Sequence, residues 1–128
     1  MSVEGFDISQ VAIGMATRSA ARFGLQQATS FATHDLDDGL PHGDPVDLVL
    51  CHLFRDPTLY PQLVERLAPG GILAIAVLSE VGAQRGRFRA SAGELHTAFI
   101  ETTATHTLVP LAVQEANGIA ILIARRTT

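Results

Sequence analysis

The stretch Leu63-Val-Glu-Arg-Leu-Ala-Pro-Gly-Gly-Ile-Leu-Ala-Ile-Ala-Val-Leu78 decides the fold class of this 128-residue chain. It starts with apolar residues at helical spacing, breaks at Pro69-Gly70-Gly71, and continues as an uninterrupted apolar run from Ile72 to Leu78. Proline and glycine together end a helix, and an unbroken apolar run of this length is typical of a buried strand. The stretch therefore predicts a helix, a turn and a strand in direct succession.

The residues before this stretch predict a second buried strand and, further upstream, a strand–helix–strand unit. Val46 to Leu50 is apolar except at Asp47 and runs into Cys51-His52-Leu53-Phe54, after which the helix begins near Pro61. Nearer the start, Val3 to Ile8 is β-prone, Ser9 is a suitable N-cap, and Gly24 suits a left-handed C-cap. The helix between them places Ala12, Met15, Ala16, Ala20 and Phe23 at helical spacing, and Ala28 to Thr33 is a weaker strand candidate.

The residues after Leu78 predict a loop, a third helix and a hairpin. Gly82 to Arg89 is rich in glycine and arginine, and Ser91-Ala-Gly-Glu94 has the pattern of a capping box. That box would open a helix with Leu95, Ala98 and Phe99 on one face. Thr105 to Val113 and Ile119 to Ala124 are strands joined across Asn117-Gly118, a strong hairpin signal.

This order of elements predicts an α/β fold. Strand, helix, strand, strand, helix, strand, helix and hairpin alternate as in a mostly parallel twisted sheet with helices on both faces. The hairpin adds one antiparallel strand at the end of the chain. Residues 1–128 are expected to form a single domain.

Composition narrows the partners and the compartment. Hydrophobic residues make up 47% of the chain, charged residues 17%, and the net charge is −4, which argues against nucleic acid because phosphate binding needs a basic face. The longest apolar run, Ile72 to Leu78, is far too short to span a bilayer, and the start of the chain is no signal peptide. The single cysteine, Cys51, suits a reducing cytoplasm.

Five segments of the chain resemble the class I S-adenosylmethionine-dependent methyltransferases. The run Val3 to Ile13 resembles that family's second strand and following helix, and His34-Asp35-Leu36 with Gly39-Leu40-Pro41 resembles its third-strand turn. Asp47 to His52 resembles the fourth strand, Leu63 to Leu73 the helix–turn–strand that follows, and Gly118 to Arg126 the closing hairpin strand.

The resemblance implies S-adenosylmethionine as the cofactor and methyl transfer to a small molecule as the activity. Asp7 would contact the cofactor's ribose hydroxyls and Asp35 its adenine amino group; Ile8 and Leu36 are further expected cofactor-binding residues, and Cys51 would lie beside the cofactor as a small apolar residue. Physical reasoning places the same residues at one edge, because ligands of open parallel sheets bind beyond the carboxyl ends of the strands. A carboxylate there can accept hydrogen bonds from both ribose hydroxyls.

The resemblance also implies an N-terminally incomplete domain. The family's first strand and glycine-rich loop would precede Val3, and no other stretch has Gly-x-Gly after a strand. Without that strand the family's sheet order leaves a gap, so the flanking strands either close up or each pair with another subunit. The alternative function is therefore a non-catalytic remnant or a self-associating interaction module. A nicotinamide-binding domain is the enzyme alternative, and the antiparallel hairpin counts against it.

Other polar residues have weaker functional interpretations. His52 is the one candidate general base, although no catalytic residue is assigned. Arg85, Arg87 and Arg89 form either a clamp for an acidic substrate or a solvated loop. No metal is expected, because the spacing of His34, His42 and His52 matches no zinc motif and the acidic turn from Asp35 fails as a calcium loop.

Overall fold

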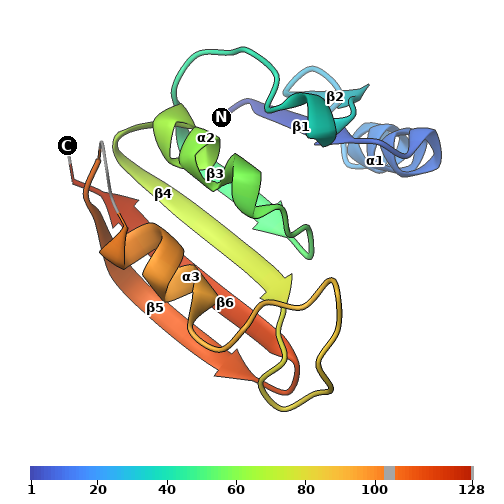
Figure 1. Ribbon diagram of the computed structural model, residues 1–128. Coiled ribbons are helices and arrows are strands. Elements are labelled where there is room, and N and C mark those ends of the chain that lie inside the picture. Colours follow the sequence, from blue (N-terminus) through green and yellow to red (C-terminus); the bar gives the residue numbers. More distant parts are fainter. Residues whose placement is uncertain (103–105, 128) are drawn as a thin grey trace. The chain divides into compact units, whose positions relative to one another are not determined.

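The computed structural model of the protein describes residues 1–102 and 106–127 (Figure 1). The chain divides into two compact units, Met1–Pro41 and His42–Thr128. Each unit has its own hydrogen-bonded sheet. A single domain across residues 1–128 stays a prediction. No helix within the described residues is long and apolar enough to cross a membrane.

The first unit is a strand–helix–strand motif. Strands β1 (Val3–Asp7) and β2 (Thr29–Thr33) pair in parallel, and helix α1 (Gln10–Arg22) connects them. As predicted, the Ser9 side chain caps α1 by accepting a hydrogen bond from its first turn at 3.1 Å, and Gly24 has the left-handed φ of 71°. A single-turn 3₁₀ helix, η1 (Leu36–Asp38), follows β2.

The helical spacing of α1 predicts one apolar face but not the depth of its burial. Ala20 is buried, whereas Met15 and Phe23, which share its spacing, are 59% and 71% exposed. The helix contacts β2 and β1, and its half-buried residues are Ala12, Ile13, Gly14 and Ala16. Met15 and Phe23 are therefore not core residues of this unit.

The second unit is built on a four-stranded mixed sheet. Its strands are β3 (Val46–His52), β4 (Leu67–Leu78), β5 (Leu108–Ala116) and β6 (Ile119–Arg126), in the spatial order β3-β4-β6-β5. β3 and β4 are parallel, and β6 runs antiparallel to both of its neighbours. The final strand is therefore inserted between β4 and β5, as Figure 1 shows.

Helices cover one face of this sheet. A 3₁₀ turn, η2 (Pro57–Leu59), leads into α2 (Tyr60–Arg66), and α3 (Glu94–His96) continues into a π-helical turn, η3 (Thr97–Glu101). Alternate residues of β4 and β6 point toward these helices, which is the two-residue period of a strand with one covered face. The largest core side chains of the unit are Leu59, Tyr60, Leu63, Leu67, Leu73, Ile75, Val77, Leu95, Phe99, Leu108 and Leu122.

The predicted α/β class is confirmed, with parallel strands, covering helices and a closing antiparallel hairpin. The hairpin turn is confirmed in detail, since Asn117 and Gly118 have φ values of 53° and 81°, as a type I′ turn requires. The predicted start of the first hairpin strand, Thr105, lies outside the described residues.

Two local predictions were wrong. Strand β4 begins at Leu67, ahead of Pro69-Gly70-Gly71, because Leu67 is already extended and pairs with Val46. The proline and glycines lie within a shift of the strand register, with Gly70 at a φ of 80°. The capping box is also absent: Gly93, at a φ of 77°, takes the N-cap position of α3 without any side-chain cap.

Candidate functional site

Two aspartates lie at the carboxyl edge of the first unit's sheet. Asp7 ends β1 opposite Thr33, the last residue of β2, and Asp35 follows two residues later. The main-chain N–H of His34 donates to the Asp7 carbonyl at 2.9 Å, which ties the two strand ends together. The structure therefore brings Asp7 and Asp35 to the same edge, as the strand-end argument predicts.

Both carboxylates shape the local backbone and remain exposed. Oδ1 of Asp7 accepts from the Ser9 N–H at 2.8 Å, and Oδ1 of Asp35 accepts from the Asp37 N–H at 2.9 Å. A carboxylate has about four acceptor positions, so each retains capacity for a ligand's donors. Ile8 and Leu36, each next in sequence to one aspartate, are 65% exposed and half-buried, respectively. Each aspartate thus offers hydrogen-bond acceptors at this edge of the sheet, and the residue next to it offers apolar surface.

His34 has a structural role in the same turn. Its Nε2 lies 2.9 Å from the carbonyl oxygen of Gly39, and its ring meets Phe6 edge-on with centroids 6.2 Å apart. These contacts close the acidic turn onto the strand that carries Asp7. Within the described residues there is no cluster of three or more potential metal ligands.

In the second unit, the tip of β3 carries Cys51 and His52. Cys51 is half-buried, its Sγ donates to the Phe54 carbonyl at 3.4 Å, and burial raises the pKa of the thiol. A thiol held protonated in this way is a poor nucleophile, which agrees with the expected packing role. His52 is exposed at the strand end and is free to meet solvent or a ligand.

The residue after His52 adopts an uncommon backbone conformation that the sequence does not signal. Leu53 has a φ of 56°, in the left-handed region that costs a non-glycine residue about 1–2 kcal/mol. The Leu53 N–H donates to the Ala76 carbonyl at 2.7 Å, so pairing with β4 holds the strained turn in place. The chain therefore reverses sharply at the point where β3 ends.

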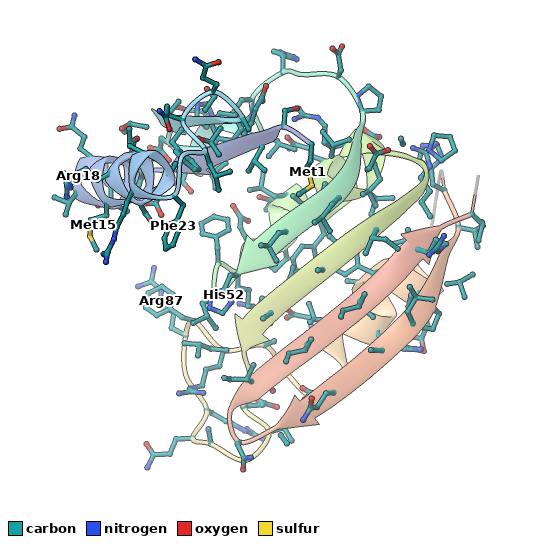
Figure 2. The ribbon with its side chains drawn as sticks, turned by 180° about the vertical axis from the view of Figure 1, so that it is seen from behind. Met1, Met15, Arg18, Phe23, His52 and Arg87 are labelled. Atoms are coloured by element: carbon teal, nitrogen blue, oxygen red, sulfur yellow. The ribbon has the colours of Figure 1, made fainter. Side chains whose placement is uncertain are left out.

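The arginine loop after β4 has a rigid base and an exposed tip. Arg89 donates to the main-chain carbonyls of Ser79 and Gly118 at 2.9 and 3.2 Å, so it belongs to the fold and not to a ligand clamp. Arg85 and Arg87 are exposed, and the Arg87 guanidinium lies 5.6 Å from the Phe88 ring centroid. Figure 2 shows Arg87 and His52 at the same end of this sheet.

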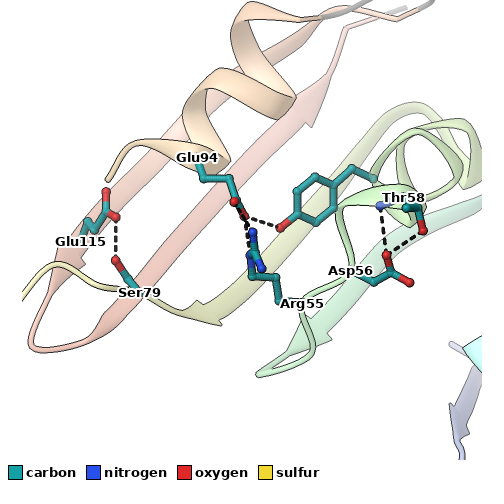
Figure 3. A network of polar contacts seen from close by, with 7 residues as sticks. Arg55, Asp56, Thr58, Ser79, Glu94 and Glu115 are labelled. Carbon is teal, nitrogen blue, oxygen red and sulfur yellow. Dashed lines mark hydrogen bonds and ion pairs between the residues drawn. The ribbon is translucent and has the colours of Figure 1, made fainter. Parts of the chain in front are cut away.

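An ion pair that the sequence did not reveal supports the segment after β3. Arg55 donates from Nε and Nη2 to the two carboxylate oxygens of Glu94, at 2.7 and 2.5 Å, and the Tyr60 hydroxyl donates to Oε2 at 3.0 Å (Figure 3). These hydrogen bonds, chiefly from Arg55, lower the pKa of Glu94. Burial, followed by the charge of Glu94, raises the pKa of Tyr60, which stays a protonated donor.

This network links the tip of β3 to the start of α3. The sequence predicts a capping role for Glu94, but its carboxylate instead accepts hydrogen bonds from Arg55 and Tyr60. Only the tertiary fold brings Arg55 and Glu94 together, since they are 39 positions apart in the chain. A buried polar side chain, Ser79, donates to Glu115 at 2.8 Å just after the end of β4 (Figure 3).

The predicted site residues thus fall into two groups. Asp7, Ile8, Asp35 and Leu36 share one edge of the first unit, and Cys51 lies at a strand tip of the second. That these residues bind one ligand together stays a prediction.

Solved structures align with almost the whole chain. The [4+2]-cyclase SpnF aligns over 100% of this chain with a TM-score of 0.75 at 17% identity. N-methyltransferase NodS from Bradyrhizobium japonicum WM9, in complex with S-adenosylhomocysteine, aligns over 98% with a TM-score of 0.70 at 22% identity. The chain has the class I methyltransferase fold.

A third methyltransferase-fold match is TehB from Haemophilus influenzae, with a TM-score of 0.72 at 17% identity over 98% of this chain. The chain spans 67% of the SpnF chain, 66% of the NodS chain and half of the TehB chain. No family model and no curated protein matches the sequence. At these identities the similarity shows the fold alone. SpnF has this fold and is a [4+2]-cyclase, so the fold by itself does not determine the chemistry.

Proposed function

We propose that this protein binds S-adenosylmethionine and transfers its methyl group to a small-molecule acceptor. The observation that carries the proposal is the placement of two exposed carboxylates, Asp7 and Asp35, at one carboxyl edge of parallel strands. Vicinal ribose hydroxyls and an adenine amino group are donors that suit such a pair of acceptors. The solved structure of NodS with S-adenosylhomocysteine supports this ligand class for the fold.

The main task of the side chains would be to bind and orient the cofactor and the acceptor, and not to take part in the reaction themselves. The bound cofactor supplies a methyl group already activated on a sulfonium, so the protein's main task is alignment with the acceptor. Asp7 would hold the ribose, Asp35 the adenine, and Ile8 and Leu36 would offer apolar surface to the base. Cys51 would contribute packing at the strand tip, since its thiol is protonated.

The exposed arginines of the loop after β4 favour a methyl acceptor that carries a negative charge. Arg85 and Arg87 stand at the exposed tip of a loop whose base is fixed by Arg89. A guanidinium binds carboxylates and phosphates in a bidentate fashion, and Phe88 beside Arg87 adds an aromatic surface. We place the acceptor's negative group at this loop and expect His52, at the same end of the sheet, to accept or pass on a proton where the acceptor loses one. The acidic net charge and the lone thiol favour a cytoplasmic enzyme without nucleic-acid partners.

The test is a calorimetric titration with S-adenosylhomocysteine. The Asp7→Asn variant keeps an Oδ1 acceptor for the Ser9 N–H and so preserves the turn, but it removes the charge offered to the ribose. Losing a charged hydrogen bond costs about 1.5–3 kcal/mol, which weakens binding roughly tenfold or more. Glu4→Gln is the matched control, because Glu4 is exposed on the same strand away from its tip, and its affinity should equal the wild type's.

The outcomes separate the proposal from its alternatives. Binding that Asp7→Asn weakens and Glu4→Gln does not would support the cofactor site, and mass spectrometry of candidate anionic acceptors would then detect the added methyl group. A folded wild type without affinity would refute cofactor binding. That result would favour the non-catalytic interaction module, which the exposed apolar surface of the second unit also suits. Binding without any methyl transfer would favour a different reaction on this fold, as in SpnF.

A further inference from the structure

Two segments that follow the parallel strands of the second unit carry the residues assigned above to the methyl acceptor. His52 begins the turn after β3, here called the β3 turn (residues 52–55), and Arg85 and Arg87 lie in the arginine loop (residues 82–89). The Leu53 N–H donates to the Ala76 carbonyl at 2.7 Å, which ties the β3 turn to β4. Groups that act on one acceptor must be held in one geometry, so the contacts that fix the loop relative to the turn bear on the reaction.

Glu115, a half-buried residue of β5, binds two segments of main chain at once (Figure 3). Its Oε1 accepts from the Ser79 hydroxyl at 2.8 Å, and its Oε2 accepts from the Gly93 N–H at 3.1 Å. The Ser79 Oγ in turn accepts from the Val81 N–H at 3.0 Å, directly before the arginine loop. Ser79 is fully buried, so its hydroxyl cannot turn to water in place of Glu115. The Glu115 carboxylate therefore fixes the start of the arginine loop.

Gly93 connects Glu115 to the ion pair that supports the β3 turn. Gly93 has a φ of 77°, and its bond to Glu115 sets the orientation of the main chain that leads into Glu94. Glu94 in turn accepts from Arg55 Nε at 2.7 Å. These polar contacts form one unbroken series, which runs through Val81, Ser79, Glu115, Gly93, Glu94 and Arg55. The series joins the arginine loop at one end to the β3 turn at the other.

A carboxylate suits the central position of this series, because it has two acceptor oxygens and each meets a different donor. The two donors lie 36 and 22 positions from Glu115 in the chain, so only folding brings them to it. Glutamine has a single carbonyl oxygen, which can keep the bond from the Gly93 N–H. Its amide nitrogen then faces Ser79, whose Oγ can accept from it but whose hydroxyl hydrogen loses its acceptor. The two ends of the series can thus be released separately.

We propose that Glu115 is a positioning residue of the acceptor site, which couples the arginine loop to the β3 turn through Ser79 and Gly93. The acceptor site itself rests on the proposed function, whereas the coupling concerns the fold of the second unit alone. Glu115 acts through the main chain that carries the arginines and His52, and not on the reacting atoms. A displacement of about 1 Å can slow a reaction by about 100-fold, so the coupling bears on kcat.

Amide hydrogen exchange of the full chain, measured by NMR without a ligand, tests the coupling. In Glu115→Ala both donors lose their acceptor. The Val81 amide should exchange at least about tenfold faster, which corresponds to one hydrogen bond to a charged group. The Leu53 amide should exchange at least about threefold faster, which corresponds to a modest coupling between linked residues. Both rates are taken relative to the amides of β6, which lies between β4 and β5 and reports global stability.

Two matched variants separate coupling from general loosening. Glu115→Gln keeps an acceptor for the Gly93 N–H, so it should speed exchange at Val81 and leave Leu53 unchanged. Gln114→Ala is the control, because Gln114 is the exposed neighbour of Glu115 on β5 and points to the other face of the strand. It should change neither amide. A Gln114→Ala variant that speeds both amides, or a Glu115→Gln variant that speeds Leu53 as much as Val81, would contradict the proposed route.

Gly93→Ala interrupts the series at a second point without changing Glu115. A Cβ at Gly93 would meet nothing within 4 Å, so the variant strains only the positive φ. It should speed exchange at Leu53 at least about threefold, as Glu115→Ala does. If Glu115→Ala fails to fold, this variant decides the matter. An unchanged Leu53 amide in either folded variant would overturn the coupling.

The kinetics of methyl transfer test the positioning role. With an acceptor identified by mass spectrometry, Glu115→Ala should lower kcat per cofactor-binding site at least about tenfold. Its affinity for S-adenosylhomocysteine should equal the wild type's, because Asp7 and Asp35 belong to the first unit. An unchanged kcat would overturn the positioning role. A wild type without affinity for S-adenosylhomocysteine would instead refute the proposed function, and the exchange rates of Val81 and Leu53 would still decide whether Glu115 couples the two segments.

Discussion

The Arg55–Glu94 pair should be the main electrostatic support of the segment that follows β3. Arg55 and Glu94 are joined by two hydrogen bonds, Tyr60 adds a third, and the two paired side chains are only 22% and 18% exposed. The pair therefore lies between an exposed ion pair, worth about 0–1 kcal/mol, and a fully buried one, whose disruption costs about 3–5 kcal/mol.

The perturbation is Glu94→Gln, which keeps the side-chain shape and an acceptor for Tyr60 but removes the charge. Glutamine has a single carbonyl oxygen, which can keep the bonds that Glu94 Oε2 accepts from Arg55 Nε and the Tyr60 hydroxyl, but its amide nitrogen then faces Arg55 Nη2 donor to donor. One charge-assisted hydrogen bond, worth about 1.5–3 kcal/mol, is lost, so the free energy of unfolding should fall by about 2 kcal/mol. Arg55 then retains a partly buried charge without its carboxylate partner, which makes this figure a lower bound.

Urea denaturation at pH 7 measures the loss, and the chain provides a matched control. His96 and Glu101 form a second pair at 3.3 Å, but their side chains are 42% and 58% exposed. Glu101→Gln should therefore change the free energy of unfolding by less than about 0.5 kcal/mol. A Glu94→Gln variant no less stable than Glu101→Gln would refute the reasoning that burial and bidentate geometry make this pair important.

The pH dependence gives a second test of the same pair. Because Arg55 and Tyr60 lower the pKa of Glu94 in the folded protein, the carboxylate stabilises the fold above its ordinary pKa near 4.5. That stabilisation is lost as the pH falls through the lower pKa of the folded state. The stability difference between wild type and Glu94→Gln should therefore be largest near neutral pH and shrink below pH 4.5. A difference that stays constant over this range would contradict the electrostatic origin.

Three further predictions concern the backbone and Cys51. Gly82→Ala should lower the free energy of unfolding, measured by urea denaturation, by at least about 1 kcal/mol more than Gly24→Ala does. Both glycines have a positive φ, but a Cβ at Gly82 would lie 2.7 Å from the Asn117 nitrogen, whereas a Cβ at Gly24 would meet nothing within 4 Å. Equal losses for the two variants would contradict this reasoning. Cys51 should react with iodoacetamide at pH 8 more slowly in the folded than in the urea-unfolded protein, since burial raises its pKa, and equal rates would argue for an accessible thiol. Ser9→Ala should lower the free energy of unfolding by about 1 kcal/mol through loss of the α1 cap, and an unchanged midpoint would show that the cap does not contribute.

The sequence by itself determined the order and type of most elements. Period-two and continuous apolar runs marked the strands, and Asn117-Gly118 marked the hairpin because few other residues adopt two successive positive φ angles. Asp7 and Asp35 could be placed near strand ends from the sequence, since Asp7 ends one β-prone run and Asp35 follows another by two residues. Their shared edge followed from the parallel pairing that alternation predicts.

The tertiary structure decided which polar side chains are structural and which are available. Glu94 fits a capping box locally, but Arg55 outcompetes the backbone for its carboxylate, and only folding brings these distant residues together. Arg89 was indistinguishable from Arg85 and Arg87 in the sequence, yet it alone of the three bonds the ends of β4 and the hairpin. The positive φ of Leu53 had no sequence signal, because leucine does not favour that conformation.

Burial was the other property beyond the reach of the sequence. Helical and strand periodicity identify an apolar face, but not whether another element covers it. Leu50 and Leu73 both lie in continuous apolar strands, yet Leu50 is 71% exposed and Leu73 is fully buried, because helices cover only one face of the sheet. The difference arises from the three-dimensional arrangement of elements far apart in the chain, which is a property of the packed structure and not of any local pattern.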